Sequence, residues 1–380
     1  MSFGLYVHFP FCSKICPYCD FYVLRESEAK RAAFLPYYEK ELKLLSEKKP
    51  ELFSHKLETI YFGGGTPSLL EAEQLAALLK LIKRYFEVFS DAEISLEANP
   101  NDLLGDKPSS FRRLGINRLS IGVQSLNDDE LKILGREHSA KQAEEAARNV
   151  KNSGFENFNI DLIFGIPSQT LISWEQTLEK AAKWKPAHVS TYSLTIEERT
   201  SFYKLAQAGE LQLPPDEDCQ EMYLRGVEFL EKEGCRQYEI SNFARPGFQS
   251  RHNRNYWQRK SYLGLGPSAH SFFKNQRWAN VRSLPVYQRK LDDGKMPLDF
   301  EETIDRQKAI EEALLLGLRQ KEGICLENLK KEFGFDLEKE KNELLKELTA
   351  KDFIQIKNGQ IRLTPPGFYV SDRIVSELFP

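Results

Sequence analysis

Three of the six cysteines, Cys12, Cys16 and Cys19, fall close together in the segment CSKICPYC. The spacing C-x3-C-x2-C lets three thiolates converge on one soft metal centre. A cubane [4Fe–4S] cluster has four irons, so three protein ligands leave one iron open for a small chelating ligand. Tetrahedral zinc usually takes four protein ligands, and no C-x2-C or H-x3-H pair follows in the sequence. The spacing favours an iron–sulfur cluster, with a zinc site or a redox centre as alternatives.

A second set of polar and glycine positions falls at or near the ends of expected strands. It consists of Gly64, Gly65 and Thr66 in GGGTP, Glu97, Gln124 in SIGVQS, Arg136 in LGREH, and Asp161. Glycines let the backbone approach a ligand closely. Asp161 lies in an apolar run, where an unpaired carboxylate is costly, so we expect it to have a partner. Plain alternatives remain for two of these positions, a solvated strand end for Glu97 and a structural partner for Asp161. Tyr6, which precedes the cysteines in YVHFPFC, is a further candidate whose plain alternative is a core aromatic.

The elements that must position these residues alternate along the first half of the chain. We expect strands at 3–9, 57–62, 93–98, 117–122, 157–164 and 187–193, with helices at 29–48, 71–88, 106–114, 127–134, 140–153 and 171–184. This βαβα order indicates a parallel sheet with helices outside it. Six units are too few for a closed eight-stranded barrel. The prediction is an α/β fold with a partial, open (β/α)6 TIM-like barrel over residues 1–235, which ends on a helix at 216–233.

The rest of the chain follows a different pattern. Residues 236–300 are rich in aromatics, Arg, Asn and Gly, and we expect an irregular connecting region that carries HNRNYW at 252–257. Helices are expected at 304–319, 325–333, 337–350 and 366–378, with a hairpin that turns at Asn358-Gly359. These elements predict a winged-helix-like α+β domain over residues 301–380.

Composition narrows the functional classes. The chain has 380 residues, 41% hydrophobic and 29% charged, with a net charge of −3, which fits an ordinary globular protein. Lys residues in 327–352 are matched by Glu, so no basic stripe indicates a nucleic-acid partner. No run approaches the roughly 20 apolar residues that span a bilayer, and the N-terminus does not read as a signal peptide. We expect a cytoplasmic protein.

The cysteine motif, placed just after a first strand and with Tyr18 before its last cysteine, resembles that of the radical-SAM superfamily. The resemblance implies that the open iron chelates S-adenosylmethionine (SAM), whose sulfonium an electron from the cluster can cleave, and that GGGTP contacts the methionine amino group. The positions that match the cofactor contacts of the related oxygen-independent coproporphyrinogen III oxidases are Tyr6, Tyr18, Gly64, Gly65, Thr66, Glu97, Gln124, Arg136 and Asp161. This resemblance covers essentially the whole chain.

Three features favour a sister group, the HemW family of heme chaperones. The oxidase motif continues to a fourth cysteine, where this chain has Phe21. The oxidases also carry an N-terminal extension, whereas only eleven residues precede Cys12. Finally, HNRNYW resembles the H-N-x-x-Y-W motif of the HemW family, which implies that His252 binds heme. Its neighbours Tyr256 and Trp257 could pack on a porphyrin face, and Arg251, Arg254 and Arg259 could pair with propionates. His270 is a second candidate, expected at the cofactor end of the barrel.

The resemblance implies a heme chaperone that holds a [4Fe–4S] cluster, SAM and heme, and passes heme to membrane respiratory hemoproteins. The alternative is oxidative decarboxylation of coproporphyrinogen III to protoporphyrinogen IX, which the absence of a fourth cysteine disfavours. The resemblance identifies no catalytic residue and leaves a homodimer and a peripheral membrane contact open.

Overall fold

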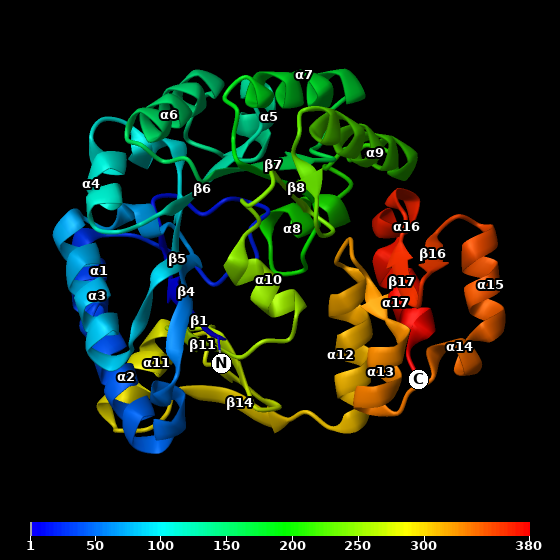
Figure 1. The fold of residues 1–380 in the computed structure, drawn as a ribbon. Coiled ribbons are helices and arrows are strands. Elements are labelled where there is room, and N and C mark those ends of the chain that lie inside the picture. The colour runs from blue at the N-terminus through cyan, green and yellow to red at the C-terminus, as the bar shows by residue number, and fades with distance from the viewer. Residues whose placement is uncertain (1) are drawn as a thin grey trace.

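A twelve-stranded sheet in the order β14-β13-β12-β11-β1-β4-β5-β6-β7-β8-β10-β9 runs through the computed structural model, which describes residues 2–380 (Figure 1). At its centre lie β1 (Ser2–Phe9), β4 (Lys56–Gly64), β5 (Val88–Ala98), β6 (Arg118–Gln124), β7 (Phe158–Phe164) and β8 (His188–Ser193). Each of these strands pairs in parallel with the next. Within the described residues the sheet has two ends, β14 and β9, so the predicted open (β/α)6 barrel is confirmed.

Helices line the outside of this curved sheet (Figure 1). They are α1 (Glu28–Phe34), α2 (Pro36–Lys48), α3 (Ala72–Tyr85), α4 (Lys107–Arg113), α5 (Asp128–Ile133), α6 (Ala140–Asn152) and α7 (Leu171–Ala182). The helix expected at 29–48 is divided in two, because Pro36 occupies the first position of α2 and proline cannot continue the ladder of a preceding helix. Two further helices, α8 (Ser201–Gln207) and α9 (Asp216–Lys232), follow β8.

The expectation of irregular structure at 236–300 was wrong. This region forms β9 (Arg236–Gln237), β10 (Asn242–Ala244), α10 (Arg251–Trp257), β11 (Tyr262–Leu265), β12 (His270–Phe273), β13 (Gln276–Asn280) and α11 (Leu284–Asp292), followed by β14 (Leu298–Thr303). Its strands extend both edges of the barrel, since β10 pairs with β8 and β11 pairs with β1. Short strands whose partners are distant in sequence carry little local periodicity. The domain boundaries at 235 and 300 stay a prediction.

The C-terminal unit has the expected winged-helix-like arrangement, beside α10 in Figure 1. It comprises α12 (Arg306–Leu318), β15 (Ile324–Cys325), α13 (Leu326–Phe333), α14 (Leu337–Glu340), α15 (Asn342–Ala350), β16 (Ile354–Lys357), β17 (Gln360–Leu363), α16 (Pro365–Tyr369) and α17 (Ser371–Leu378). The strands form a sheet in the order β15-β17-β16. Asn358 and Gly359 turn the hairpin with φ of 52° and 71°, as a primed turn requires. Within residues 2–380, no helix is long and apolar enough to cross a membrane.

A buried carboxyl group on α2 binds the residue after β11, the end of β13 and helix α11. Glu41 accepts hydrogen bonds from Gly266 N at 2.8 Å, Asn280 Nδ2 at 2.5 Å and Tyr287 OH at 2.6 Å. Burial, which these hydrogen bonds only partly offset, raises the pKa of Glu41 from 4.5 to about 7. The folded protein therefore holds this proton more tightly than the unfolded chain.

This tighter hold makes the effect of Glu41→Gln depend on pH. Stability tied to the Glu41 proton is complete below pH 4.5 and is lost as pH rises to about 7. Relative to the parent, the free energy of unfolding of the variant should therefore rise by about 3 kcal/mol between pH 4.5 and 7.5. Urea titrations across this range measure the difference, and any hydrogen-bond loss independent of pH cancels from it. Glu47→Gln, at an exposed position of α2, is the control; parallel profiles for both variants would contradict the prediction.

Candidate functional site

A cavity of about 630 Å³ lies at the C-terminal ends of the parallel strands, and we call it the cysteine cavity. The predicted site residues on its wall are Cys12, Cys16, Tyr18, Cys19, Gly64, Gly65, Thr66, Glu97, Gln124, Arg136 and Asp161. They come from five strands or the loops that follow them, so the sheet collects positions that are far apart in the sequence. This is the edge at which barrels of parallel strands build their sites.

Two glycines are required where β4 meets the segment that leads to the cysteines. A Cβ on Gly64, whose φ is +98°, would lie 2.3 Å from the ring of His8. A Cβ on Gly65 would lie 2.6 Å from the carbonyl oxygens of Phe9 and Phe11. Gly65 N also donates to Phe9 O at 2.8 Å. The close contact of these backbones sets the place of Cys12 against the cavity.

A chain of hydrogen bonds joins the first and second cysteines. Thr66 Oγ1 donates to Cys12 Sγ at 3.3 Å, and Asn99 Nδ2 donates to Thr66 Oγ1 at 3.3 Å. Arg136 completes the chain, with Nη2 2.6 Å from Asn99 Oδ1 and Nη1 3.5 Å from Cys16 Sγ. The guanidinium thus stands beside the thiols, where its positive charge favours thiolate ligands.

The three thiols fit an iron–sulfur cluster because sulfur is the donor that such clusters take and because all three lie on the wall of one cavity. Burial raises the pKa of Cys12 to about 12, against the opposing effects of the Thr66 hydrogen bond and the Arg136 charge. A metal centre must therefore displace a proton to bind this thiol. Within residues 2–380, no three His, Cys, Asp or Glu side chains already form a group that could hold a metal ion. What qualifies the cysteines is their soft donor atoms and their common cavity wall.

Two carboxyl groups face the same cavity from β5 and β7. Glu97 accepts from Tyr61 OH at 2.8 Å and from Gly64 N at 3.1 Å, and burial raises its pKa to about 7, with a smaller contribution from Asp161. Asp161 has the partners expected of a buried acid, Ser120 Oγ at 3.0 Å and Asn159 Nδ2 at 2.8 Å. Two acids and one guanidinium match a ligand that carries an ammonium, a sulfonium and a carboxylate.

Tyr6 and His252 are not on the wall of the cysteine cavity. The Tyr6 hydroxyl meets His8 Nδ1 at 3.1 Å. His252 is 1% exposed, with Nδ1 2.7 Å from Thr59 Oγ1 and Nε2 2.7 Å from Tyr256 OH. Burial lowers its pKa to about 3. Because both ring nitrogens already have partners, ligation of iron by His252 would require one of these hydrogen bonds to break.

Sequence reasoning missed Asn99 and Tyr61, which also line the cysteine cavity. Asn99 directly follows β5, two residues after Glu97. The strand-end rule that selected Glu97 could have found it. Tyr61 lies inside β4, where its aromatic ring looks like a core residue, and no local signal marks its hydrogen bond to Glu97.

Comparisons with known proteins agree with this arrangement. The family model described as "Radical SAM superfamily" matches residues 6–181, and the "HemN C-terminal domain" model matches residues 304–370. The protein named heme chaperone HemW of Bacillus subtilis is 36% identical over 374 residues, which cover 97% of each chain. The protein of that name from Lactococcus lactis is 35% identical over 369 residues, covering 97% of this chain and 95% of its own length.

The chain belongs to the HemW family. This membership confirms the family prediction made from the cysteine motif, Phe21 and HNRNYW. The coproporphyrinogen III oxidase HemN of Escherichia coli, described as a radical SAM enzyme, has the same fold. The TM-score is 0.85 at 24% sequence identity, and the match covers 99% of this chain and 90% of the HemN chain. The barrel and C-terminal unit described above are thus shared beyond the HemW family.

Proposed function

We propose that this member of the HemW family binds heme and delivers it to membrane respiratory hemoproteins, and that it carries a [4Fe–4S] cluster and SAM. One observation supports the proposal most strongly: the similarity to relatives named heme chaperone spans nearly the full length of both chains. The cysteine cavity supports the cluster and SAM, because it gathers all three motif cysteines with the two acids and Arg136.

The residues of the cysteine cavity divide into two groups by chemistry. Cys12, Cys16 and Cys19 would hold the cluster, which when bound supplies an electron that can cleave the SAM sulfonium. Arg136 offers a guanidinium to a carboxylate, and Glu97 offers an acceptor to an amine or a ribose hydroxyl. Tyr18, Gly64, Gly65, Thr66, Gln124 and Asp161 complete the proposed SAM contacts. Tyr6 stacks on Tyr61 with 6.2 Å between the ring centroids, and would support the cavity wall through that ring.

The proposed location is cytoplasmic, with heme transfer at the surface of the membrane. A homodimer and a peripheral contact with the membrane are part of this proposal. No role in nucleic-acid binding is proposed.

Anaerobically reconstituted protein should bind heme at one equivalent per chain and should form no protoporphyrinogen IX from coproporphyrinogen III, SAM and a reductant. The reason is Phe21, a residue that is 67% exposed and stands where the oxidase motif has a cysteine, because a phenyl ring transfers neither protons nor electrons as a thiol does. A heme titration monitored by absorbance tests heme binding, and chromatography of the porphyrin products tests the absence of oxidase activity. Protoporphyrinogen IX formed in proportion to enzyme would instead establish the oxidase function.

A further inference from the structure

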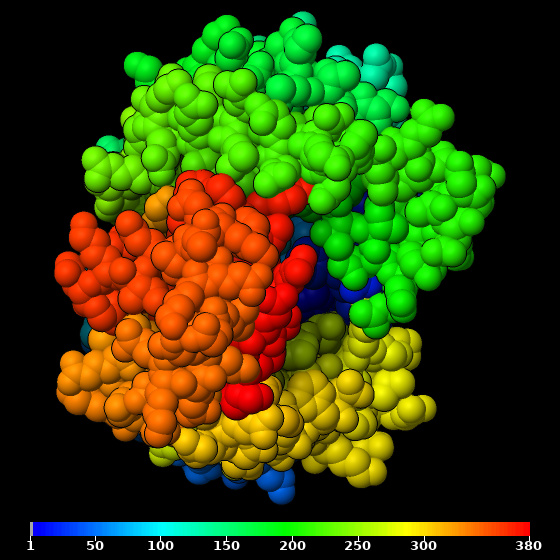
Figure 2. Space-filling view, turned by 90° about the vertical axis from the view of Figure 1, so that its right-hand side faces the viewer, coloured from blue at the N-terminus to red at the C-terminus, as the bar shows by residue number. Residues whose placement is uncertain are grey.

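A second cavity, of about 540 Å³, borders the cysteine cavity, and we call it the arginine cavity. Asp20 and Phe21, directly after the last motif cysteine, line both. The remaining wall comes from β1, α10, the strands β11–β13, α12 and the loops that carry Arg199, Arg259, Lys260 and Arg282. Figure 2 shows a hollow on this face, where segments near residues 200 and 280 meet the C-terminal unit. The volume lies in the range of small-molecule and cofactor sites, about 300–1,000 Å³.

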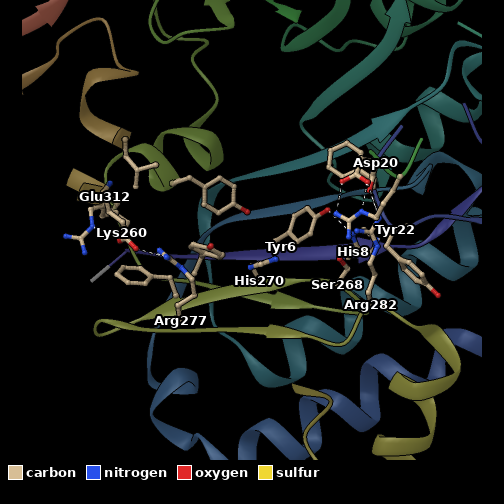
Figure 3. A pocket seen from close by; sticks show the side chains of 17 residues that line it. Tyr6, His8, Asp20, Tyr22, Lys260, Ser268, His270, Arg277, Arg282 and Glu312 are labelled. Atoms are coloured by element: carbon tan, nitrogen blue, oxygen red, sulfur yellow. Dashed lines mark hydrogen bonds and ion pairs between the residues drawn. The ribbon is translucent and has the colours of Figure 1, made fainter. Parts of the chain in front are cut away.

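The wall of the arginine cavity is aromatic between two polar ends. Figure 3 shows Lys260, Arg277 and Glu312 at one end and Asp20 and Arg282 at the other. Between them the cavity is lined by Tyr6, Phe21, Tyr256, Tyr262 and Phe272. Five Lys and Arg side chains on the wall face only two carboxylates, although the chain as a whole has a net charge of −3. A flat, apolar ligand with acidic groups at its edge matches this distribution.

The end near α12 has uncompensated positive charge. Glu312 Oε1 pairs with Arg277 Nη1 at 2.5 Å, and its Oε2 pairs with Arg259 Nε at 3.2 Å. Arg259 Nη2 is buried without a hydrogen-bond partner among the described residues. Lys260, on the same wall, forms no ion pair within residues 2–380. Arg277 Nη1 also lies 4.0 Å from Glu302, which pairs with Lys308 at 2.6 Å. Glu312 is thus the one carboxylate on the wall at this end, beside the three cations Arg259, Lys260 and Arg277, which leaves room for an added anionic group.

His270 is the histidine on this wall with a free lone pair. Its side chain is exposed, lies between the two polar ends in Figure 3, and packs edge-on against Phe300 at 5.9 Å. Neither of its ring nitrogens has a hydrogen-bond partner among residues 2–380, whereas each of the other five histidines uses at least one. Desolvation and then the charge of Arg277 lower the pKa of His270, so the neutral imidazole prevails at physiological pH.

We propose that the arginine cavity is the heme site, with His270 as an axial iron ligand and the propionates directed at Lys260, Arg259 and Arg277. The proposal rests on the heme-binding function proposed above and names its place. Neutral imidazole is a common axial ligand of heme iron. Aromatic side chains pack on a porphyrin face, and guanidinium groups form bidentate ion pairs with carboxylates. Binding here is coordination and ion pairing, so it needs no oxidant or reductant.

His252 then acts through Tyr256 and is a positioning residue. Its Nε2 hydrogen bond holds the Tyr256 hydroxyl, and the Tyr256 ring lies on the wall of the arginine cavity. The ring of His252 also stacks on Tyr61, with 5.1 Å between the ring centroids, and this contact holds the imidazole in place. The motif HNRNYW thereby shapes the cavity without reaching iron.

The test is hemin titration, with absorption and electron paramagnetic resonance spectra, on the full chain. His270→Ala should weaken binding by about tenfold or more and change the spin-state signature, and added imidazole should restore the parent spectrum. His252→Gln should keep the parent ligand signature with weaker affinity. His55→Ala, which alters a histidine outside both cavities, should match the parent.

A parent spectrum and affinity in His270→Ala would overturn the site, as would loss of the axial signature in His252→Gln alone. If the parent itself binds no hemin, the proposed heme function fails, which is a distinct result. Lys260→Gln provides a second test that should leave folding unaffected, because Lys260 forms no ion pair in the described chain. The variant should weaken hemin binding, by no more than about fivefold, and should leave binding of hemin dimethyl ester, whose propionates carry no charge, unchanged. Equal effects on both probes would contradict the placement of the propionates.

Discussion

Replacing Cys12, Cys16 and Cys19 together by alanine should abolish the incorporation of iron and sulfide during anaerobic reconstitution. These three residues are the cysteines on the wall of the cysteine cavity, so no fourth thiol stands ready to take over. Thiolates are the ligands that hold iron–sulfur clusters. Iron and acid-labile sulfide analysis, together with the visible absorption of the reconstituted protein, measures the outcome.

The matched control is Cys325→Ser. Cys325 is the N-cap residue of α13 and makes no capping hydrogen bond with its side chain. Serine is a favourable N-cap, so the variant should keep its full iron content and could gain up to about 1 kcal/mol of stability. If the triple variant kept the iron content of the parent, these three cysteines would not be the cluster ligands.

Gly65→Ala should destabilise the fold and disrupt the cysteine cavity at once. The new methyl group would lie 2.6 Å from two backbone carbonyl oxygens and 2.8 Å from Phe11 N, and backbone cannot turn away as a side chain can. Overpacking of this kind costs about 1–3 kcal/mol. Because the displaced strand leads straight to Cys12, we also expect SAM affinity and cluster retention to fall.

Urea unfolding of the apo protein separates the stability loss from the loss of ligands. Gly226→Ala in α9 is the control, because its new Cβ would lie at an ordinary 3.4 Å from the Trp174 ring and alanine favours a helix interior. The prediction would be contradicted if Gly65→Ala kept the stability and SAM affinity of the parent, since the backbone at Phe9 and Phe11 would then move aside at little cost.

The barrel and the cysteine cavity could be predicted from the sequence because both depend on local patterns. The run around Asp161 and the apolar strand before Gly64 have the length of buried strands, and the chemistry-bearing residues follow such strands. Where parallel strands end together, residues distant in sequence must meet. That rule explains why Glu97 was found. Arg136, which follows α5 (Asp128–Ile133), was found through the resemblance of its motif LGREH to the related family.

The features that the sequence did not predict depend on contacts between residues that are far apart in the chain. Strands β9 and β10 are two and three residues long, and they join the sheet because β10 pairs with distant β8. His252 stands in a motif that invites a ligand role, yet its nitrogens are taken by Thr59, 193 positions away, and by Tyr256. Tyr6 was assigned to the cofactor, and the structure places it on the arginine cavity. Partners of this kind are invisible until the chain is folded.

Asp20 and Phe21 line both cavities, so the two proposed ligands, SAM and heme, would share this segment as a common wall. Asp20 is held from the arginine-cavity side by Arg199 at 3.1 Å and by Arg282, whose Nη2 lies 2.6 Å from its carbonyl oxygen. If binding in one cavity shifts this segment and changes the affinity of the other cavity, binding in the second changes the affinity of the first by the same factor, since thermodynamic coupling is reciprocal. If the proposed function holds, the affinity for heme would respond to the contents of the cysteine cavity through Asp20 and Phe21 alone, without a long-range conformational change.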